Sequence, residues 1–187
     1  MIALWVILGI VVVVGFLILM NYNGLVRLRN QVRNAWAQID VQLKRRHDLI
    51  PNLVETVKGY AAHERQTLEA VTNARNLALQ AVGHGAGAQS KAEGELSGAL
   101  SRLLAVAENY PDLKANQNFL ALQEELASTE NKISFSRQFY NDSVLNYNNK
   151  VQMFPSNIVA GIMGFRMDQF FEVEVSAERE APKVSFA

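Results

Sequence analysis

A chain of 187 residues has room for one membrane anchor and one domain of ordinary size. Its 18 basic and 18 acidic residues cancel, which argues against a dedicated nucleic-acid binder, because such proteins usually carry a basic excess. The absence of cysteine excludes disulfides, iron–sulfur clusters and thiolate zinc sites.

Residues 2–20 carry no charge and consist mostly of Val, Ile, Leu and Phe. A helix of roughly 19 residues, rising about 1.5 Å per residue, spans about 28 Å, which is close to the hydrocarbon thickness of a bilayer. The rival interpretation is a cleaved signal peptide, but no Lys or Arg precedes this stretch and Met20–Tyr22 is a poor cleavage site. We therefore predict a retained transmembrane anchor over residues 1–22.

The charges beside this anchor predict its orientation. Arg27, Arg29 and Arg33 follow the apolar stretch before the first acid, Asp40, and no charge precedes it. Because Lys and Arg are enriched on the cytoplasmic side of membrane spans, we expect a single-pass protein with a cytoplasmic bundle and a short N-terminus outside.

After the anchor, apolar residues recur every three or four positions in four stretches, which is the spacing of amphipathic helices. The first begins at Leu25 and is predicted to end near the basic cluster 44–47, since cations favour helix C-termini. Pro51 then marks a second helix start, and that helix ends in the glycine-rich loop 83–87. The capping-box residues of segment 90–93 predict the start of a third helix.

The fourth stretch is the most regular. From Phe119 to Tyr147 its seam residues follow in steps of three and four, which is a heptad pattern typical of helices that wrap around one another. Short connections imply antiparallel neighbours. The prediction is an all-α fold in which an elongated, coiled-coil-like antiparallel bundle occupies residues 23–153.

The last predicted part, residues 154–187, is an apolar connector followed by an extended tail. Period-two alternation over 171–175 indicates a short strand. Three interpretations of segment 153–171 are open: it folds back as a cap on the bundle, lies in the membrane interface, or packs on a neighbouring subunit. The candidate interaction residues are Ile158, Ile162, Phe165, Phe170, Phe171, Val173 and Val175.

No metal site or cofactor is expected. His63 and Glu64 begin like the zinc-helix motif HExxH, but Thr67 stands where the second histidine is required. No histidine has Glu or Asp three residues before it, so the di-iron bundle pattern is missing too. We expect His47, His63 and His84 to be solvated.

Other polar motifs also favour structural roles over catalysis. The loop 83–87 follows a helix and lacks the Gly-Lys-Ser/Thr of a phosphate loop. The basic cluster 44–47 is either a partner contact or, as we prefer, compensation for a helix terminus and neighbouring acids. Thr129, Ser136 and Ser143 lie on the heptad seam without a base to activate a hydroxyl, which favours close packing. No catalytic residue is predicted.

Several motifs resemble those of the LemA family of bacterial membrane proteins. They are residues 22–26, 36–54, 126–131, 139–141 and 154–160, so the resemblance covers nearly the whole chain. It implies an N-terminal anchor and a long-helix bundle in the bacterial inner membrane, in agreement with the apolar stripes. It assigns no activity, cofactor or metal to particular residues.

These features together favour a non-enzymatic scaffold or adaptor of the inner membrane. The anchor, the heptad seam and the apolar C-terminal segment suggest that the bundle forms a homo-oligomer or recruits a membrane-protein partner, rather than nucleic acid. The alternative is a sensing or regulatory module that controls a membrane protease or an envelope-stress response.

Overall fold

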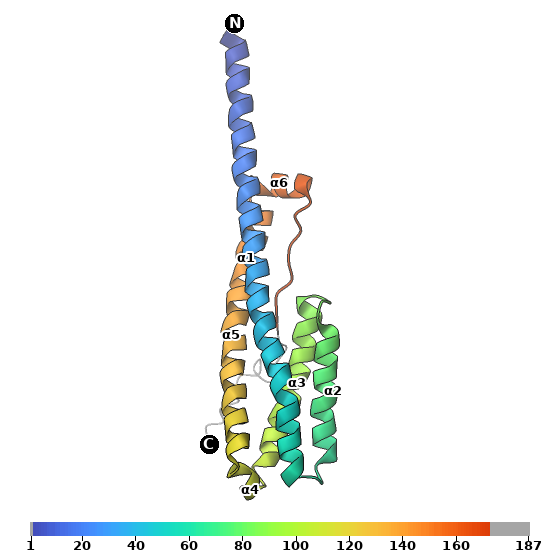
Figure 1. Ribbon diagram of the computed structural model, residues 1–187. Coiled ribbons are helices and arrows are strands. Elements are labelled where there is room, and N and C mark those ends of the chain that lie inside the picture. Colours follow the sequence, from blue (N-terminus) through green and yellow to red (C-terminus); the bar gives the residue numbers. More distant parts are fainter. Residues whose placement is uncertain (1, 173–187) are drawn as a thin grey trace, which may run out of the picture. The chain divides into compact units, whose positions relative to one another are not determined.

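The computed structural model describes residues 2–172 of the chain, which fold into α-helices with no β-strand among them (Figure 1). The helices are α1 (Ile2–Tyr60), α2 (Arg65–Ala81), α3 (Ala86–Ala107), α4 (Pro111–Lys114), α5 (Gln117–Gln152) and α6 (Ser156–Met163). The predicted all-α fold is confirmed. The strand predicted over 171–175 does not begin at Phe171, and its last three residues lie outside the described part.

Helix α1 is longer than the sequence pattern predicts. It runs past the basic cluster 44–47 and past Pro51 without a break, so the predicted helix end near His47 is wrong. A proline inside a helix cannot donate to the carbonyl four residues earlier, here that of His47. The Arg75 Nε–H of α2 donates to this carbonyl instead, at 2.8 Å. A side chain from a neighbouring helix thus replaces the hydrogen bond that Pro51 removes.

Helix α3 begins earlier than predicted. Its N-cap is Gly85, which has a φ of 95° that favours glycine, and Ala86 is its first residue. Ser90 and Glu93 therefore lie inside the helix and are buried, so the predicted capping box is wrong. The reason is tertiary: the carboxylate of Glu93 contacts Arg46 and His47 on α1 and does not cap the backbone N–H groups at the start of its own helix.

The described chain divides into two compact units. Of the described residues, unit 1 contains 2–41 and 133–170, and unit 2 contains 42–132 together with 171 and 172. Helices α1 and α5 each contribute to both units, because the divisions fall within them. The three-part division predicted from the sequence, at residues 22 and 153, stays a prediction.

In unit 1 the part of α1 that follows the apolar stretch packs against the second half of α5. Trp36 and Tyr140 meet edge to face, with ring centroids 5.2 Å apart, and Gly24 lies beside Lys150. Residue numbers rise along α5 as they fall along α1, so the two helices are antiparallel here, as predicted. The buried apolar residues of this pairing are Leu25, Val32, Ala35, Ile39, Ile133, Tyr140, Val144 and Tyr147.

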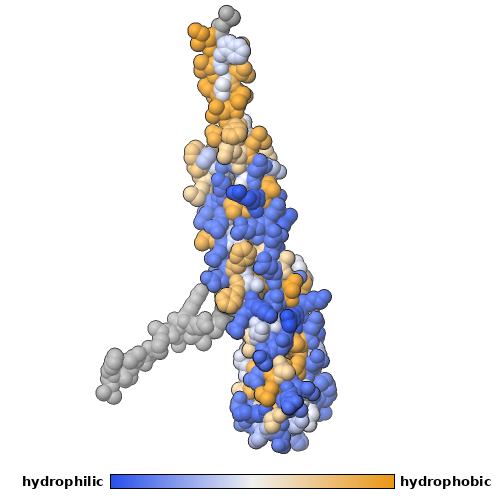
Figure 2. Space-filling view, turned by 60° about the vertical axis from the view of Figure 1, so that its left-hand side comes forward, coloured by the Kyte–Doolittle hydropathy of each residue, from blue (hydrophilic) through white to orange (hydrophobic). Residues whose placement is uncertain are grey.

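Unit 1 also contains the one described helix that is long and apolar enough to cross a membrane. None of its apolar window is buried by the rest of the chain, and Figure 2 shows a hydrophobic surface around this part of α1. A helix that is apolar all round and has no protein covering it is typical of a lipid-exposed segment.

In unit 2 the antiparallel pair α2 and α3 packs on the end of α1 and the start of α5 (Figure 1). The core is built from leucines, valines and alanines at helical spacing, and each full burial of a large apolar side chain contributes about 1.5–3 kcal/mol. The largest of these are Ile50, Leu53 and Val57 from α1, Leu68 and Val71 from α2, Leu96, Leu100 and Leu103 from α3, Leu113 from α4 and Phe119 from α5.

The hydroxyl residues of the α5 seam take the structural role that the sequence favours. Thr129 and Ser143 are buried, and each hydroxyl donates to the carbonyl four residues earlier, at 2.8 Å in both cases. Ser136 is half-buried. Small side chains that bond to their own helix let a neighbouring helix approach closely.

Candidate functional site

Helix α6 is fixed to α1 close to the end of the apolar stretch. It ends at Gly164, whose left-handed φ of 71° turns the chain so that Phe165 folds back. The Phe165 ring is buried, lies edge to face with Tyr22 at 5.8 Å between centroids, and sits under the Arg29 guanidinium at 4.8 Å. At the other end of α6, the Ser156 hydroxyl lies 2.6 Å from the carbonyl oxygen of Lys150 in α5.

The segment after α6 runs along α5. The Asn148 side chain donates to the Asp168 carbonyl and accepts from the Asp168 amide, at 2.9 Å each. The Tyr140 hydroxyl donates to the Gln169 carbonyl at 2.9 Å. Burial raises the pKa of Tyr140 to about 12, with the nearby Asp168 carboxylate adding to the effect. Burial also raises the pKa of Asp168, against the opposing effect of Arg33 and Arg29.

The predicted interaction residues fall into different environments. Ile158 and Ile162 lie on an exposed face of α6, with 54% and 76% of their surface accessible. Phe165 and Phe171 are buried within the chain, and Phe170 is half-buried. Val173 and Val175 lie outside the described residues. Two of the seven side chains therefore share an open apolar face, and two others hold the segment to its own chain.

The exposed face of α6 belongs to a larger apolar surface without charge. Residues 151–165 contain no charged side chain, whereas Lys150 and Arg166 flank them. The exposed large apolar residues of this segment and its ends are Met153, Phe154, Ile158, Ile162, Met163 and Met167. We call this set the α6 face.

A second surface feature of unit 1 is a shallow groove of about 630 Å³ along α1 and α5. Its lining is rich in side-chain amides and includes one basic and one aromatic residue: Asn23, Val26, Arg27, Asn30, Gln31, Asn34, Gln38 and Phe139. Phe135 lies one helical turn before Phe139 on α5, and the two rings are 74% and 44% exposed. Aromatic side chains this open, beside a polar groove, are typical of a contact surface.

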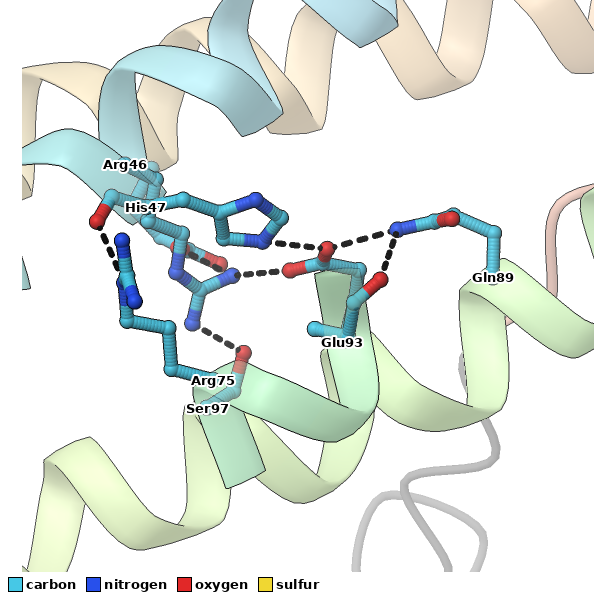
Figure 3. A network of polar contacts seen from close by, with 8 residues as sticks. Arg46, His47, Arg75, Gln89, Glu93 and Ser97 are labelled. Atoms are coloured by element: carbon cyan, nitrogen blue, oxygen red, sulfur yellow. Dashed lines mark hydrogen bonds and ion pairs between the residues drawn. The ribbon is translucent and has the colours of Figure 1, made fainter. Parts of the chain in front are cut away.

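Unit 2 contains a buried polar network that the sequence analysis missed (Figure 3). His47 Nε2 lies 2.8 Å from Glu93 Oε1, which also accepts from Gln89 Nε2 at 2.8 Å. The Arg46 guanidinium donates to Ser97 Oγ at 2.7 Å and lies 3.6 Å from the second oxygen of Glu93. These groups come from α1 and α3, and all but Ser97 are buried.

The network corrects two expectations. His47 is buried and bonded, not solvated, whereas His63 and His84 are exposed as expected. The basic cluster does not compensate a helix terminus, because α1 continues for more than three turns beyond it. It does satisfy neighbouring acids: Arg45 pairs with Glu125, and Arg46 lies 3.2 Å from Glu130 as well as near Glu93.

A local signal for this network does exist in the sequence. The pair 46–47 falls between Leu43 and Ile50 on the apolar stripe of its helix, and Glu93 falls three residues before Leu96. A polar residue at a core position needs a partner inside the fold. The partner itself could not be found, because His47 and Glu93 are 46 residues apart along the chain.

The network has the chemistry of a structural clamp. Its charged groups are almost completely inaccessible to solvent, and they are bonded to one another. Among residues 2–172, no group of three or more His, Cys, Asp or Glu side chains is placed to hold a metal ion. These buried contacts join α1 to α3.

Comparison with known proteins agrees with this architecture. The sequence profile of the LemA family matches residues 35–186. The chain belongs to the LemA family. The matched range includes α6 and the residues of the buried network. With its apolar N-terminal helix, the chain is a membrane-associated LemA protein.

Three relatives show how far the similarity extends. Magnetosome protein MamQ 2 of Paramagnetospirillum magneticum is 26% identical over 192 residues, covering 89% of this chain and 71% of the relative. Magnetosome protein MamQ of Magnetospirillum gryphiswaldense is 24% identical over 178 residues, covering 82% of this chain and 65% of the relative. Protein LemA of Metamycoplasma hominis is 28% identical over 138 residues, covering 74% of this chain and 63% of the relative.

Proposed function

We propose that this LemA protein is a non-enzymatic scaffold or adaptor of the bacterial inner membrane. Residues 2–20 anchor it, the bundle faces the cytoplasm, and the bundle associates laterally with membrane proteins, including copies of itself. The proposal rests above all on one observation: the open Phe135–Phe139 pair beside the amide-lined groove of unit 1.

The composition of this surface suits protein contacts in the membrane plane. Large rings such as Phe135 and Phe139 supply most of the apolar area that a partner buries, while the amides of Asn30, Asn34 and Gln38 adapt their hydrogen bonds to different partners. These amides carry no charge that a partner would have to neutralise. Burial of a polar surface in which only Arg27 is charged therefore costs less than burial of a largely ionic one.

The anchor favours self-association at this surface. Copies that share one bilayer meet with their α1 helices parallel, so the α1 side of the groove on one copy lies level with that on the next. On α1 the stripe Asn23, Asn30 and Asn34 follows steps of seven and four, which keeps it on one side of the helix. Single asparagines at such positions are known to specify register in parallel helix pairs.

The buried network supports a structural role over a catalytic one. Its His, Arg and Glu groups are the most reactive side chains that the fold brings together, and they are enclosed by the core. A catalytic acid or base must reach its substrate directly or through one water. These groups instead contact one another inside the fold, where they are inaccessible to solvent.

The test is mass photometry of the full-length protein in mild detergent. We expect a defined oligomer, and we expect the double variant Phe135→Gln/Phe139→Gln to shift the mass toward the monomer. The matched control, Leu77→Gln/Leu120→Gln, changes two residues that are each 49% exposed and lie on other parts of the bundle, and it should leave the mass unchanged.

A truncation before Met153 separates the groove from the C-terminal segment. Retention of the oligomer after truncation supports the groove as the joint. A wild-type protein that is monomeric in detergent and forms no crosslinks in cell membranes contradicts the scaffold proposal.

A further inference from the structure

The α6 face has a specific position relative to the membrane anchor. Helix α6 lies beside α1, crosswise to it, near the end of the apolar stretch (Figure 1). The contact between Phe165 and Tyr22 holds it there, two residues beyond Met20. Helix α6 and this part of α1 both belong to unit 1.

Helix geometry gives the depth of this position. Gly24, which lies beside Lys150 near the end of α5, is four residues past Met20, or about 6 Å along a helix axis. The headgroup zone on each side of a bilayer is roughly 5–8 Å thick, since the hydrocarbon core is about 30 Å and the whole bilayer about 40–45 Å. When residues 2–20 span the hydrocarbon, α6 therefore lies at the level of the headgroups.

The two sides of α6 differ in what covers them. Ser156, Val159 and Ala160 are buried, and the Ser156 hydroxyl contacts the carbonyls of Lys150 and Met153 at the end of α5. Because α5 runs toward the anchor, the side of α6 that rests on α5 faces away from the bilayer. Ile158 and Ile162 are spaced by four residues and lie on the opposite side of α6, and Phe154, just before the helix, is also exposed.

The charges around this face fit an anionic lipid surface. No charge occurs between the half-buried Lys150 and the exposed Arg166, and Arg27 is a further exposed cation, seven residues past Met20 on α1. Apolar residues that enter the acyl boundary, flanked by cations that meet lipid phosphates, are the pattern of an interfacial helix. Water is a poor solvent for a continuous surface of this kind.

From these observations we propose that α6 is a monotopic interfacial helix, whose Phe154, Ile158 and Ile162 insert into the headgroup–acyl boundary of the same leaflet from which α1 emerges. The inference rests on the anchor of the proposed function but assigns the α6 face to lipid and not to a second copy. The anchor and α6 then contact the bilayer at two points, and this fixes the tilt and rotation of unit 1 on the membrane.

Single-cysteine labelling tests the proposal in the full chain, which has no native cysteine. An environment-sensitive fluorophore is attached to Ile162→Cys or, as a second variant, to Phe154→Cys. Both positions are exposed, so neither substitution removes a core contact. The protein is reconstituted in phosphatidylcholine–phosphatidylglycerol vesicles that contain lipids with a nitroxide quencher either near the glycerol or deep in the acyl chain.

Two positions on α1 serve as controls. Val13→Cys lies in the middle of the apolar stretch and reports insertion of the anchor. Val41→Cys is 62% exposed, and it lies 21 residues past Met20, about 32 Å beyond the hydrocarbon along the helix axis. We expect the deep quencher to act on position 13, the shallow quencher to act several-fold more strongly on positions 154 and 162 than the deep one, and neither to act on position 41.

The outcomes separate the two proposals. Quenching at position 13 without quenching at 154 and 162 overturns the interfacial helix and leaves the anchor in place. Fluorescence at 162 that is shielded from lipid and changes with the protein-to-lipid ratio identifies a second copy as the occupant, which also overturns it. Absence of quenching at positions 13, 154 and 162 overturns the anchor and the interfacial helix together.

Discussion

His47 Nε2 lies 2.8 Å from Glu93 Oε1, and both side chains have 3% or less of their surface accessible. This contact joins α1 to α3 across 46 residues of sequence, in the middle of an otherwise apolar core. The Arg46 guanidinium lies beside the same carboxylate, so one acid serves two basic groups. Glu93 is therefore the residue on which the polar part of unit 2 depends.

Replacement of this acid should destabilise unit 2 strongly. We expect Glu93→Gln to lower the free energy of unfolding by about 3 kcal/mol, because the variant leaves a buried guanidinium without its nearby buried countercharge. The matched control is Glu95→Gln, an exposed position on the same helix, which should change stability by less than about 0.5 kcal/mol. Urea unfolding followed by circular dichroism measures both. Equal effects at the two positions would show that the network does not stabilise the fold.

The bond from Arg75 to the His47 carbonyl predicts an energetic coupling with Pro51. Arg75→Met leaves this carbonyl without its donor and should cost about 1–3 kcal/mol. Pro51→Ala restores a backbone N–H that can donate to the same oxygen. We therefore expect the double variant to recover most of the loss, with a coupling energy of at least about 1 kcal/mol in a double-mutant cycle of urea unfolding. Strictly additive effects would show that Arg75 does not take the place of the hydrogen bond that Pro51 removes.

Phe165 should hold α6 to α1. Phe165→Ala removes a buried ring that contacts Tyr22 and Arg29, and such truncations cost about 3–5 kcal/mol. We expect this loss of stability to appear as local opening of α6, which is measured as faster hydrogen exchange of the α6 amides. The control Phe154→Ala removes a ring that is 80% exposed and should leave exchange nearly unchanged in detergent. Unchanged exchange in both variants would mean that other contacts position α6.

Tyr140 should make the stability of unit 1 depend on alkaline pH. Burial raises its pKa to about 12 from a usual 10.0, so the folded state retains a proton that the unfolded state loses between these values. The stabilisation is fully present below pH 10 and is lost as the pH rises toward 12, by up to about 2–3 kcal/mol. In Tyr140→Phe the slope should shrink, and what remains includes the part contributed by Tyr147, whose pKa burial also raises. Thermal unfolding across this pH range measures the slope. An unchanged slope would exclude Tyr140 as its source.

Local pattern was sufficient wherever a structural feature depends on neighbouring residues alone. The apolar run 2–20 defines one candidate membrane span, since hydrophobicity and length are properties of the run itself. The steps of three and four from Phe119 to Tyr147 correctly predict a long helix with a buried seam. The break before α2 was predicted less well, because the second helix start was placed at Pro51 instead of Arg65, whereas the break after α2 lies at the predicted glycine-rich loop.

The features that the sequence pattern missed all depend on residues far apart in the chain. Pro51 by itself predicts a helix boundary, but the helix continues because Arg75 donates the missing hydrogen bond. Ser90 and Glu93 by themselves predict a helix cap, but the Glu93 carboxylate contacts His47 instead. In each case a tertiary contact outweighs a local preference of about 1–3 kcal/mol. The environment of the C-terminal segment also depends on contacts with distant residues, since its composition left three interpretations open.

By itself, the sequence determined that this protein is helical, carries one long apolar segment and has apolar stripes to bury, because these properties follow from composition and period. Only the tertiary structure decided that Arg46, His47 and Glu93 belong inside the core, and that α6 turns Phe165 inward and Ile162 outward. The physical reason is that burial of a charge or the choice of a helix face depends on the partner across the interface, and partner identity is not a local property of the chain.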